Sequence, residues 1–527
     1  MLLGNIMSAQ KRTNYILKPD SLATASISCS SCNIKVIKPQ NHAVANDPLV
    51  FKPDIFLGDA VFREKADFEN IIFIGGVDFD GSTFLADFTS YTNKFNEGIQ
   101  FDNATFSSVT SFHTNKFKKT SSFRSAIFKN DVEFFENFFI DEAGFSGASF
   151  SKGADFQRNN FSGAVDFSDA KFNGDFNFTN VTFSSYANFS GATINGRINF
   201  NETEFTGPLI LKNIITSDAT VFNFNSAVLP QIIDLSNNLT LKTTIDLTGH
   251  LVTGVSQKSY MSSPNYSYLN LYNTNVSKVK IDYQHFRLCF YGSSEKPFTV
   301  ETRVAYFDEG KKHMAFPLEN PALCDSMLKT QYVQNYLKKI FPTCKTTDTV
   351  VVSFLKYCMK AAYFPGPLSK DQILSTYEQV LKNFKDNGQT DSYEALDIEY
   401  RDFKNGSFIL PHIWNLYGYR REWVFYWALA FLAFFTTTTT FFLPILNKPT
   451  AEGGVYHMDN LNIDPATERW YNRLWYAFMY TSTLFFILKV DVSKLNFKKK
   501  AGVFYIVLIY SLGVLCLGYM ANFVLQK

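Results

Sequence analysis

The chain has 527 residues, of which 56 are Phe, 27 are Tyr and 5 are Trp, so aromatic residues make up 17% of it. Apolar residues account for 46% and charged residues for 19%, which excludes an intrinsically disordered chain, because such chains are poor in apolar and aromatic residues. The 50 Lys and Arg against 48 Asp and Glu give a formal charge of +2, which argues against a strongly basic nucleic-acid-binding protein.

The N-terminal segment, residues 1–56, carries a short cysteine motif. Residues 1–28 lack the apolar core of a secretory signal, so we expect the chain to start in the cytoplasm. Cys29 and Cys32 have half the spacing of a zinc ribbon, but no second Cys-x-x-Cys follows and the nearest histidine is His42. We therefore expect two ordinary thiols on a hairpin, with no metal and no other cofactor.

Phenylalanine recurs with a period of eleven residues through residues 57–211. One series runs in steps of eleven from Phe62 to Phe205, and a second runs from Phe68 to Leu211. Together they hold 28 positions, of which 25 are Phe, and the gaps between the two series alternate between six and five residues. A helix has a period near 3.6 and a simple strand a period of 2, so this spacing predicts a chain that turns a corner after each short strand.

Small or β-branched side chains usually stand two residues before each Phe, as Ala104 stands before Phe106 and Val165 before Phe167. The residues between are mostly Asn, Asp, Gly, Ser and Thr, which form turns. One large and one small inward side chain on each face predict a β-solenoid.

The A-D/N-F-x-x pattern resembles that of pentapeptide-repeat proteins, in the variant in which Phe is the central residue and steps of five and six alternate. The resemblance covers residues 57–211 and implies a right-handed quadrilateral β-helix with four faces, 22 residues per coil and about seven coils. The Phe side chains are then structural, and each contributes about 2–3 kcal/mol through its burial. The expected repeat core includes Phe106, Phe112, Phe117, Phe123, Phe128, Phe134, Phe145, Phe150, Phe156, Phe161, Phe167 and Phe172.

Beyond the repeats, the register loosens. Strand-like pairs such as Ile233 with Leu235 continue, and residues 212–310 are expected to form irregular coils and the cap of the solenoid. A helical connector is expected over residues 311–410, and its first two helices are interrupted near Pro342.

A helical hairpin follows in the connector. The first helix is expected to begin at a capping-box sequence at Ser369 and to end at an Asn-Gly pair at Gly388. The second helix is expected to be capped at Asp391 and to end at Gly406. The segment from Tyr377 to Gly388 resembles the Y-x-x-L-K-x-x-F-x-x-x-G hairpins of membrane-anchored pentapeptide-repeat proteins, which implies a rigid connector or an oligomer contact. A packed hairpin without a further role explains the pattern equally well.

The C-terminal part, residues 411–527, contains two long uncharged segments, 424–446 and 501–525. Each exceeds the ~20 residues that cross a bilayer. Tyr417 and Tyr419 precede the first segment, as interfacial aromatic residues do. We therefore expect a multi-pass protein of the cell (inner) membrane, with an α-helical transmembrane domain after the β-solenoid and the helical connector.

The segment between the two spans, residues 474–488, is apolar but only 15 residues long. This length suits a re-entrant or interfacial helix, or a short tilted span. Arg420 and Arg421 precede the first span, so we expect the N-terminal β-helix in the cytoplasm. If the middle segment spans, the five Lys of residues 489–502 return to the cytoplasm and obey the positive-inside rule; if it re-enters, they lie outside and break it.

The order of long span, short apolar helix and long span resembles the pore module of two-span channels, which related pentapeptide-repeat proteins carry at the same place. A potassium filter needs a TVGYG-like run of backbone carbonyls, whereas residues 480–491 contain no Gly. Potassium selectivity is therefore not expected, and both a non-selective pore and a plain anchor stay open.

Several polar and small residues of this region are candidates for pore lining or helix packing. Threonine hydroxyls in a span usually bond back to their own helix, and a water-facing wall would need two or three that do not. Small residues suit close helix packing and oligomerisation. The candidates are Thr436, Thr437, Thr440, Thr481, Thr483, Gly513, Gly518 and Asn522.

Catalytic motifs such as HExxH, GxSxG and GxxxxGK[ST] are absent from the sequence, and we expect no enzyme. The first hypothesis is a cytoplasmic β-helix that senses or binds an unknown protein, joined to oligomerised helices that form a channel-like pore or membrane effector in the lipid bilayer. The alternative is a non-conducting, membrane-tethered interaction scaffold. A third reading, a DNA mimic that binds topoisomerases, is weaker, because residues 57–211 carry 20 acidic and 12 basic residues; we expect no nucleic-acid partner.

Overall fold

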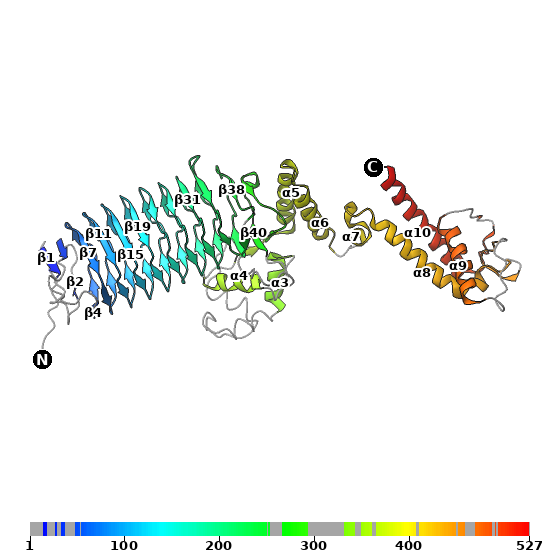
Figure 1. Cartoon of the computed structure of the whole chain (residues 1–527), viewed down its shortest axis with the longest axis horizontal. Helices are drawn as coiled ribbons and strands as arrows, with labels where there is room; N and C mark the ends of the chain where they lie inside the picture. Colours follow the sequence, from blue (N-terminus) through cyan, green and yellow to red (C-terminus); the bar gives the residue numbers. More distant parts are fainter. Residues whose placement is uncertain are drawn as a thin grey trace. The chain divides into compact units, whose positions relative to one another are not determined.

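The structure, a computed structural model, describes residues 14–17, 27–28, 33–36, 48–249 except 53, 251–252, 266–292, 331–342, 349–360, 365–406, 410–449, 452–458, 469–486, 491 and 494–525. These residues form two compact units, one ending at Tyr393 and one beginning at Glu394. The first unit holds a β-solenoid with helices near its C-terminal end, and the second holds a group of apolar helices (Figure 1).

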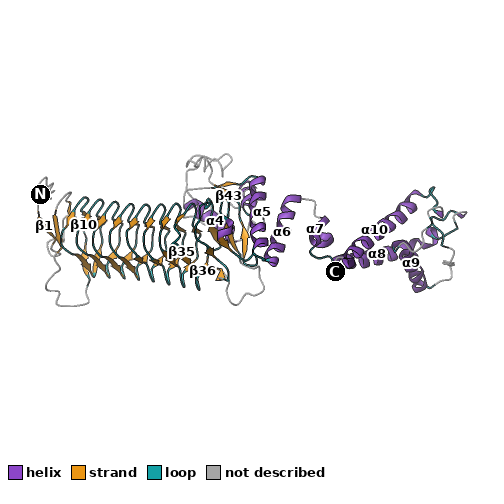
Figure 2. Ribbon diagram, turned by 90° about the horizontal axis from the view of Figure 1, so that it is seen from above, coloured by secondary structure: helices purple, strands orange, loops and turns teal. Residues whose placement is uncertain are grey.

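The solenoid is built from four parallel β-sheets, one on each side of the coil (Figure 2). In the regular part of the solenoid, each strand pairs with the strand 22 residues further along the chain. The described strands make about ten turns, which confirms the predicted β-solenoid fold. One coil consists of β14 (Thr105–Phe106), β15 (Thr110–His113), β16 (Lys116–Phe117) and β17 (Ser121–Ser122).

The four sheets extend on both sides of the repeats recognised in the sequence. Their first described strands are β1 (Asn14–Leu17), β2 (Ile27–Ser28), β4 (Leu49–Phe51) and β7 (Ala66–Glu69). Their last described strands are β34 (Ile215–Thr216), β35 (Val221–Asn223), β39 (Leu251–Val252) and β42 (Phe286–Leu288). The predicted hairpin around the N-terminal cysteines is wrong, because β2 and β3 (Asn33–Val36) belong to different sheets; Cys29 and Cys32 themselves lie outside the described residues.

Phenylalanine rings fill the interior of the solenoid in columns. Phe134 stacks on Phe112 with ring centroids 4.7 Å apart and on Phe156 at 4.9 Å, and both pairs of rings are within 4° of parallel. Neighbouring columns meet edge to face, as in the pair Phe134 and Phe145 at 5.4 Å. These are the two favourable arrangements of aromatic rings, so the eleven-residue repeat builds one continuous aromatic core.

Two corners of each coil have a left-handed backbone conformation, which therefore recurs every eleven residues. Fifteen positions in steps of eleven, from Asp59 to Asn213, have φ between 53° and 70°. Three of them are Gly and six are Asn or Asp, the residues that adopt this conformation most readily. All of them after Asp59 lie two residues after a position of the second Phe series, and this turn signal is readable in the sequence.

A column of asparagines forms a second, polar ladder inside the solenoid. Asn93, Asn115, Asn137 and Asn159 are at most 1% exposed and follow one another at intervals of 22 residues. The Asn137 Nδ2 donates to the Phe112 carbonyl at 2.7 Å and to the Asn159 Oδ1 at 3.1 Å. Each buried amide is thus satisfied by its neighbours, which removes the cost of burying it.

Helices α3 (Gln331–Ile340) and α4 (Thr349–Lys360) cover part of the twelve-stranded sheet. They bury Leu337 and Phe354 against Tyr268 of β40 (Ser267–Asn270) and against Tyr291. The two helices confirm the prediction of a pair of helices broken near Pro342.

Helix α5 (Lys370–Asp386) closes the C-terminal end of the solenoid. The Asn383 Nδ2 donates to the Val276 carbonyl at 3.2 Å, and the Tyr377 ring lies 5.0 Å from the Phe290 ring. The helix therefore covers part of the last coil, whose strand edges would otherwise be exposed, as the end of a solenoid requires. The irregular coils that precede it do not complete this cap by themselves.

The predicted ends of the hairpin helices are mostly present. Ser369 and Gln372 form the capping box of α5, and Gly388 follows the helix with φ of +67°. Helix α6 (Thr390–Asn405) ends before Gly406, as predicted, but begins at Thr390, so Asp391 lies inside its first turn and is not its cap.

The second unit continues from α6 into a group of apolar helices. Its elements are α7 (Leu410–Asn415), the 3₁₀ helix η4 (Leu416–Gly418), α8 (Trp423–Leu446), α9 (Trp470–Phe485) and α10 (Lys500–Leu525). Helices α8 and α10 contain the two predicted spans, and α9 contains most of the short apolar segment between them.

Candidate membrane module

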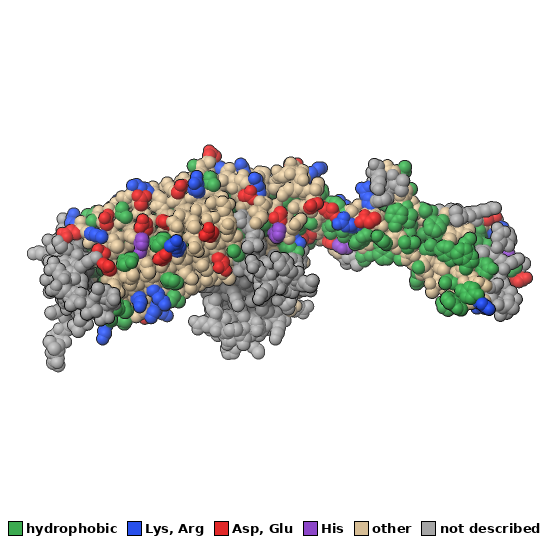
Figure 3. Space-filling view, viewed as in Figure 1, with side chains coloured by type: hydrophobic (Ala, Val, Ile, Leu, Met, Phe, Trp, Pro, Cys, Tyr) green, Lys and Arg blue, Asp and Glu red, His purple; other side chains and the backbone are tan. Residues whose placement is uncertain are grey.

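Among the described residues, two helices, α8 and α10, are long and apolar enough to cross a bilayer. Only 28% and 22% of their most apolar stretches are buried inside the protein, so neither is the core helix of a soluble fold. Phe441 is 77% exposed and Phe504 is 70% exposed, and apolar side chains cover much of this unit's surface in Figure 3. Such surfaces are found where lipid or other chains cover them, which suggests membrane association.

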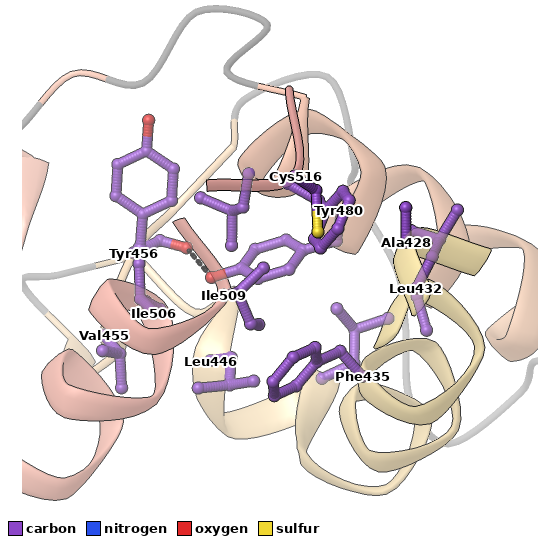
Figure 4. Packing of buried hydrophobic residues seen from close by; sticks show 14 residues of the cluster. Ala428, Leu432, Phe435, Leu446, Val455, Tyr456, Tyr480, Ile506, Ile509 and Cys516 are labelled. Atoms are coloured by element: carbon purple, nitrogen blue, oxygen red, sulfur yellow. Dashed lines mark hydrogen bonds between the residues drawn. The ribbon is translucent and has the colours of Figure 1, made fainter. Parts of the chain in front are cut away.

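The inward faces of α8, α9 and α10 form one apolar cluster (Figure 4). Phe435 of α8, Leu484 of α9 and Ile509 of α10 are each at most 3% exposed. The Tyr480 Oη at the centre of the cluster donates to the Tyr456 backbone carbonyl at 2.9 Å. The cluster fixes the short helix α9 between the two long ones.

The described segments that flank α9 meet at one end of the module. Before the helix, Tyr456 lies just beyond the C-terminus of α8; after it, Leu495 forms an antiparallel bridge with Tyr456. The Asp491 backbone N–H also donates to the Tyr456 Oη at 3.0 Å. The other end of α9 lies midway along α10, because a Cβ at Gly513 would collide with the Phe485 carbonyl oxygen.

Of the two arrangements that the sequence left open, the meeting of these two segments is the one that a re-entrant helix would have. The lysines before α10, Lys494 and Lys498 to Lys500, lie at the end of the module opposite to Arg420 and Arg421. Both ends of the two long helices are basic, so the positive-inside rule does not determine the orientation. The cytoplasmic placement of the solenoid stays a prediction.

The threonine candidates divide into two groups. The hydroxyls of Thr437, Thr440 and Thr483 each donate to the carbonyl four residues earlier in their own helix, at 2.8 Å. Thr436 is buried, and its hydroxyl has no hydrogen-bond partner among the described residues. The bonding back to the helix is the structural role expected of threonine in a span.

Thr481 belongs to a buried chain of hydroxyl groups that joins the three helices. Its hydroxyl donates to the Thr439 Oγ1 at 3.1 Å, and Thr439 lies 2.9 Å from the Tyr505 Oη. The Tyr505 hydroxyl in turn donates to the Phe435 carbonyl at 3.1 Å. Thr439 was not among the predicted candidates, since nothing local distinguishes it from its four threonine neighbours.

The small and polar candidates on α10 also differ in their burial. Gly513 is buried and is the point of closest approach between α10 and the end of α9. Gly518 and Asn522 are exposed, and a Cβ at Gly518 would meet nothing within 4 Å. Gly513 thus serves packing within one chain, whereas the other two are available for contacts outside it.

Polar side chains of α6 hold the segment that precedes α8. The Tyr419 hydroxyl and the Arg401 Nε both donate to the Asp397 Oδ2 at 2.7 Å, and the Tyr417 hydroxyl donates to the Asp402 Oδ1 at 2.6 Å. Burial, followed by the bond to Asp402, raises the pKa of Tyr417. The two tyrosines expected at the lipid interface therefore bond carboxylates of the connector, a pairing that the sequence did not reveal because the partners are 15 and 22 residues apart.

Comparison with known families concerns the solenoid. A family model described as pentapeptide repeats, with nine copies, matches residues 160–204. This part of the solenoid therefore consists of pentapeptide repeats. Together with α8 and α10, it fits a membrane-anchored pentapeptide-repeat protein, as the sequence predicted. No curated protein and no solved structure matches the chain.

In the solenoid, the twelve predicted core phenylalanines are all at most 1% exposed. Within the part of the chain that the structure describes, no group of three or more His, Cys, Asp and Glu side chains is placed to hold a metal ion. Residues 487–490, which lie in the stretch compared with a potassium filter, fall outside the described residues.

Proposed function

We propose that this pentapeptide-repeat protein is a membrane effector whose C-terminal helices assemble from several copies into a channel-like pore. The observation that carries the proposal is the re-entrant path of α9, whose flanking segments meet at the bridge between Tyr456 and Leu495. A helix that enters and leaves on one side between two long apolar helices is the arrangement of a pore module.

The direction of α9 supports passage of cations. Its C-terminal residue, Phe485, lies against Gly513, the fourteenth of the 26 residues of α10. The carbonyl end of a helix carries about half a negative charge, and here that end lies near the middle of the apolar layer. The lack of Gly after it favours a pore that does not select potassium.

The pore would form between copies of the chain, because the three helices of one copy enclose an apolar cluster. The exposed Gly518 and Asn522 of α10 supply small and polar contacts suited to helix association in a membrane. The pentapeptide-repeat domain would bind a protein partner on the side of the membrane where α6 lies. The proposal includes no catalysis.

The test is cation flux into vesicles that contain the full-length protein, together with its oligomeric state in detergent. We expect an oligomer with flux, and loss of flux in Gly513→Val, which forces α9 away from α10. Ser511→Val adds similar bulk to an exposed position of α10 and should conduct normally. A monomer without flux under every condition would refute the pore.

A second candidate function is a non-conducting, membrane-tethered interaction scaffold. It is favoured by apolar side chains on the outside of the solenoid, where Phe138 is 52% and Ile140 is 44% exposed. Phe138 pairs in register with Lys116, so this face combines an aromatic group with a positive charge. A stable monomer without flux that binds a protein through Phe138, and loses it in Phe138→Ser, would support the scaffold.

A further inference from the structure

A cavity of about 530 Å³ opens where α8 ends and α10 begins. Phe442 and Ile445 of α8 form one wall, and Lys498, Lys499 and Lys500 form another. All of these residues belong to the second unit, and neither the pore nor the scaffold uses the cavity.

The basic wall of the cavity carries three unbalanced charges. The side chains of Lys498, Lys499 and Lys500 are exposed, and none forms an ion pair with an acidic residue that the structure describes. Three ammonium groups on consecutive residues repel one another. An anion between them would relieve this repulsion and gain charge-assisted hydrogen bonds.

The other wall is apolar and continues outside the cavity. Phe442 is 52% exposed and Ile445 is 56% exposed, on the same helix that the bilayer would surround. The hydroxyl groups near the cavity already donate their protons within the protein, Thr438 to the Phe434 carbonyl and Tyr505 to the Phe435 carbonyl. The lysines are therefore the groups that would bind an anion here. A ligand that fits both walls has an anionic head and a hydrocarbon chain.

We propose that this cavity binds an anionic phospholipid, with its phosphodiester group between Lys498, Lys499 and Lys500 and an acyl chain along Phe442 and Ile445. Basic pockets at the ends of transmembrane helices favour anionic headgroups, and long lysine side chains reach the headgroup level. A bound lipid would join the end of α8 to the start of α10 and hold the segment through which α9 re-enters. The proposal rests on the membrane placement of the module and holds for a pore and for an anchor.

The test uses the full-length protein, stripped of lipid in detergent and titrated with phosphatidylglycerol or phosphatidylcholine while bound lipid is counted by native mass spectrometry. We expect phosphatidylglycerol to bind at least ten-fold more tightly than phosphatidylcholine. The triple variant Lys498→Gln, Lys499→Gln, Lys500→Gln should lose this preference, and the triple Arg variant should keep it. Lys338→Gln with Lys339→Gln, an exposed pair on α3, should change nothing.

Two further measurements distinguish a phospholipid from free phosphate as the bound anion. Phe442→Ala keeps the charge and should weaken binding of phosphatidylglycerol, while inorganic phosphate and glycerol phosphate should not displace the lipid. Equal affinity for both lipids, an unaffected Gln variant, or displacement by inorganic phosphate would overturn the lipid site. Flotation with pure phosphatidylcholine vesicles tests the membrane placement separately. A protein that fails to float refutes the membrane anchor. A protein that floats but shows no lipid preference refutes only the lipid site in the cavity.

Discussion

The solenoid and the C-terminal helical unit use apolar residues in opposite ways. In the solenoid, the repeated Phe rings point inward and each column is shared by many coils, so Phe128 and Phe150 have equivalent surroundings. In the helical unit, Phe441 and Phe504 point outward, and the interior is held by contacts that occur once, such as that between Gly513 and Phe485. Because its coils repeat, the solenoid has many equivalent core positions, whereas the helical unit depends on contacts of single residues.

The largest expected effect in the solenoid comes from removing one ring of a column. Phe134→Ala deletes a ring that stacks on two others, so the free energy of unfolding should fall by about 3–5 kcal/mol. Hydrogen exchange of the flanking coils in the full-length protein measures the loss. Phe138→Ala, at an exposed position four residues away, should cost less than about 1 kcal/mol; equal effects of the two variants would contradict the stacked core.

The asparagine ladder should contribute less than a ring column. Asn137→Ala leaves the Phe112 carbonyl and the Asn159 amide short of a partner, at a cost of about 1–3 kcal/mol. Hydrogen exchange should rise at residues near 115 and 159 and not at the ends of the solenoid. Exchange that rises equally over all coils would show that the ladder does not act locally.

In the helical unit, the buried hydroxyl chain should contribute about 1 kcal/mol. Thr439→Val removes the link between Thr481 and Tyr505, which should lower the Tm of the module in detergent. Thr437→Val makes the same change where the hydroxyl only bonds its own helix, so its Tm should stay close to that of the wild type. A larger loss in Thr437→Val would reverse the roles assigned to the two hydroxyls.

The smallest expected effect is a dependence on pH at the end of the solenoid. Burial raises the pKa of Asp234 above its ordinary value, although the Ser236 N–H donates to its Oδ1 at 2.9 Å. The folded protein thus holds this proton more tightly than the unfolded chain, so the contribution of Asp234 to stability is greatest below about pH 4 and is lost as the pH rises through the folded pKa. Asp234→Asn should gain Tm over the wild type as the pH rises from about 4 to 8; a difference that is independent of pH would refute the buried carboxylate.

The contrast between repeated contacts in the solenoid and single contacts in the helical unit also explains which features the sequence predicted. The eleven-residue Phe period repeats often enough to define a four-sided coil, and long uncharged segments are sufficient to identify α8 and α10. The asparagine ladder and the left-handed corners had readable signals, at periods of 22 and eleven residues, because they also repeat.

The remaining features depend on contacts between distant residues and have no local pattern. The meeting of the two segments that flank α9 follows from the bridge between Tyr456 and Leu495. The attachment of the segment before α8 follows from bonds to Asp397 and Asp402. The helical cap of the solenoid likewise depends on contacts of α5 with residues about 100 positions earlier. A short apolar segment alone does not distinguish between a span and a re-entrant helix.

The most direct test of this account is the sidedness of the two segments that flank α9. Single cysteines at Glu452, Phe497 and Glu422, all exposed, are introduced into the full-length protein after its native cysteines have been replaced. A thiol reagent that does not cross membranes is then applied to sealed vesicles of one orientation. The re-entrant path predicts that positions 452 and 497 react from the same side and position 422 from the other; labelling of 452 and 497 from opposite sides would show that α9 spans the membrane and would contradict the account.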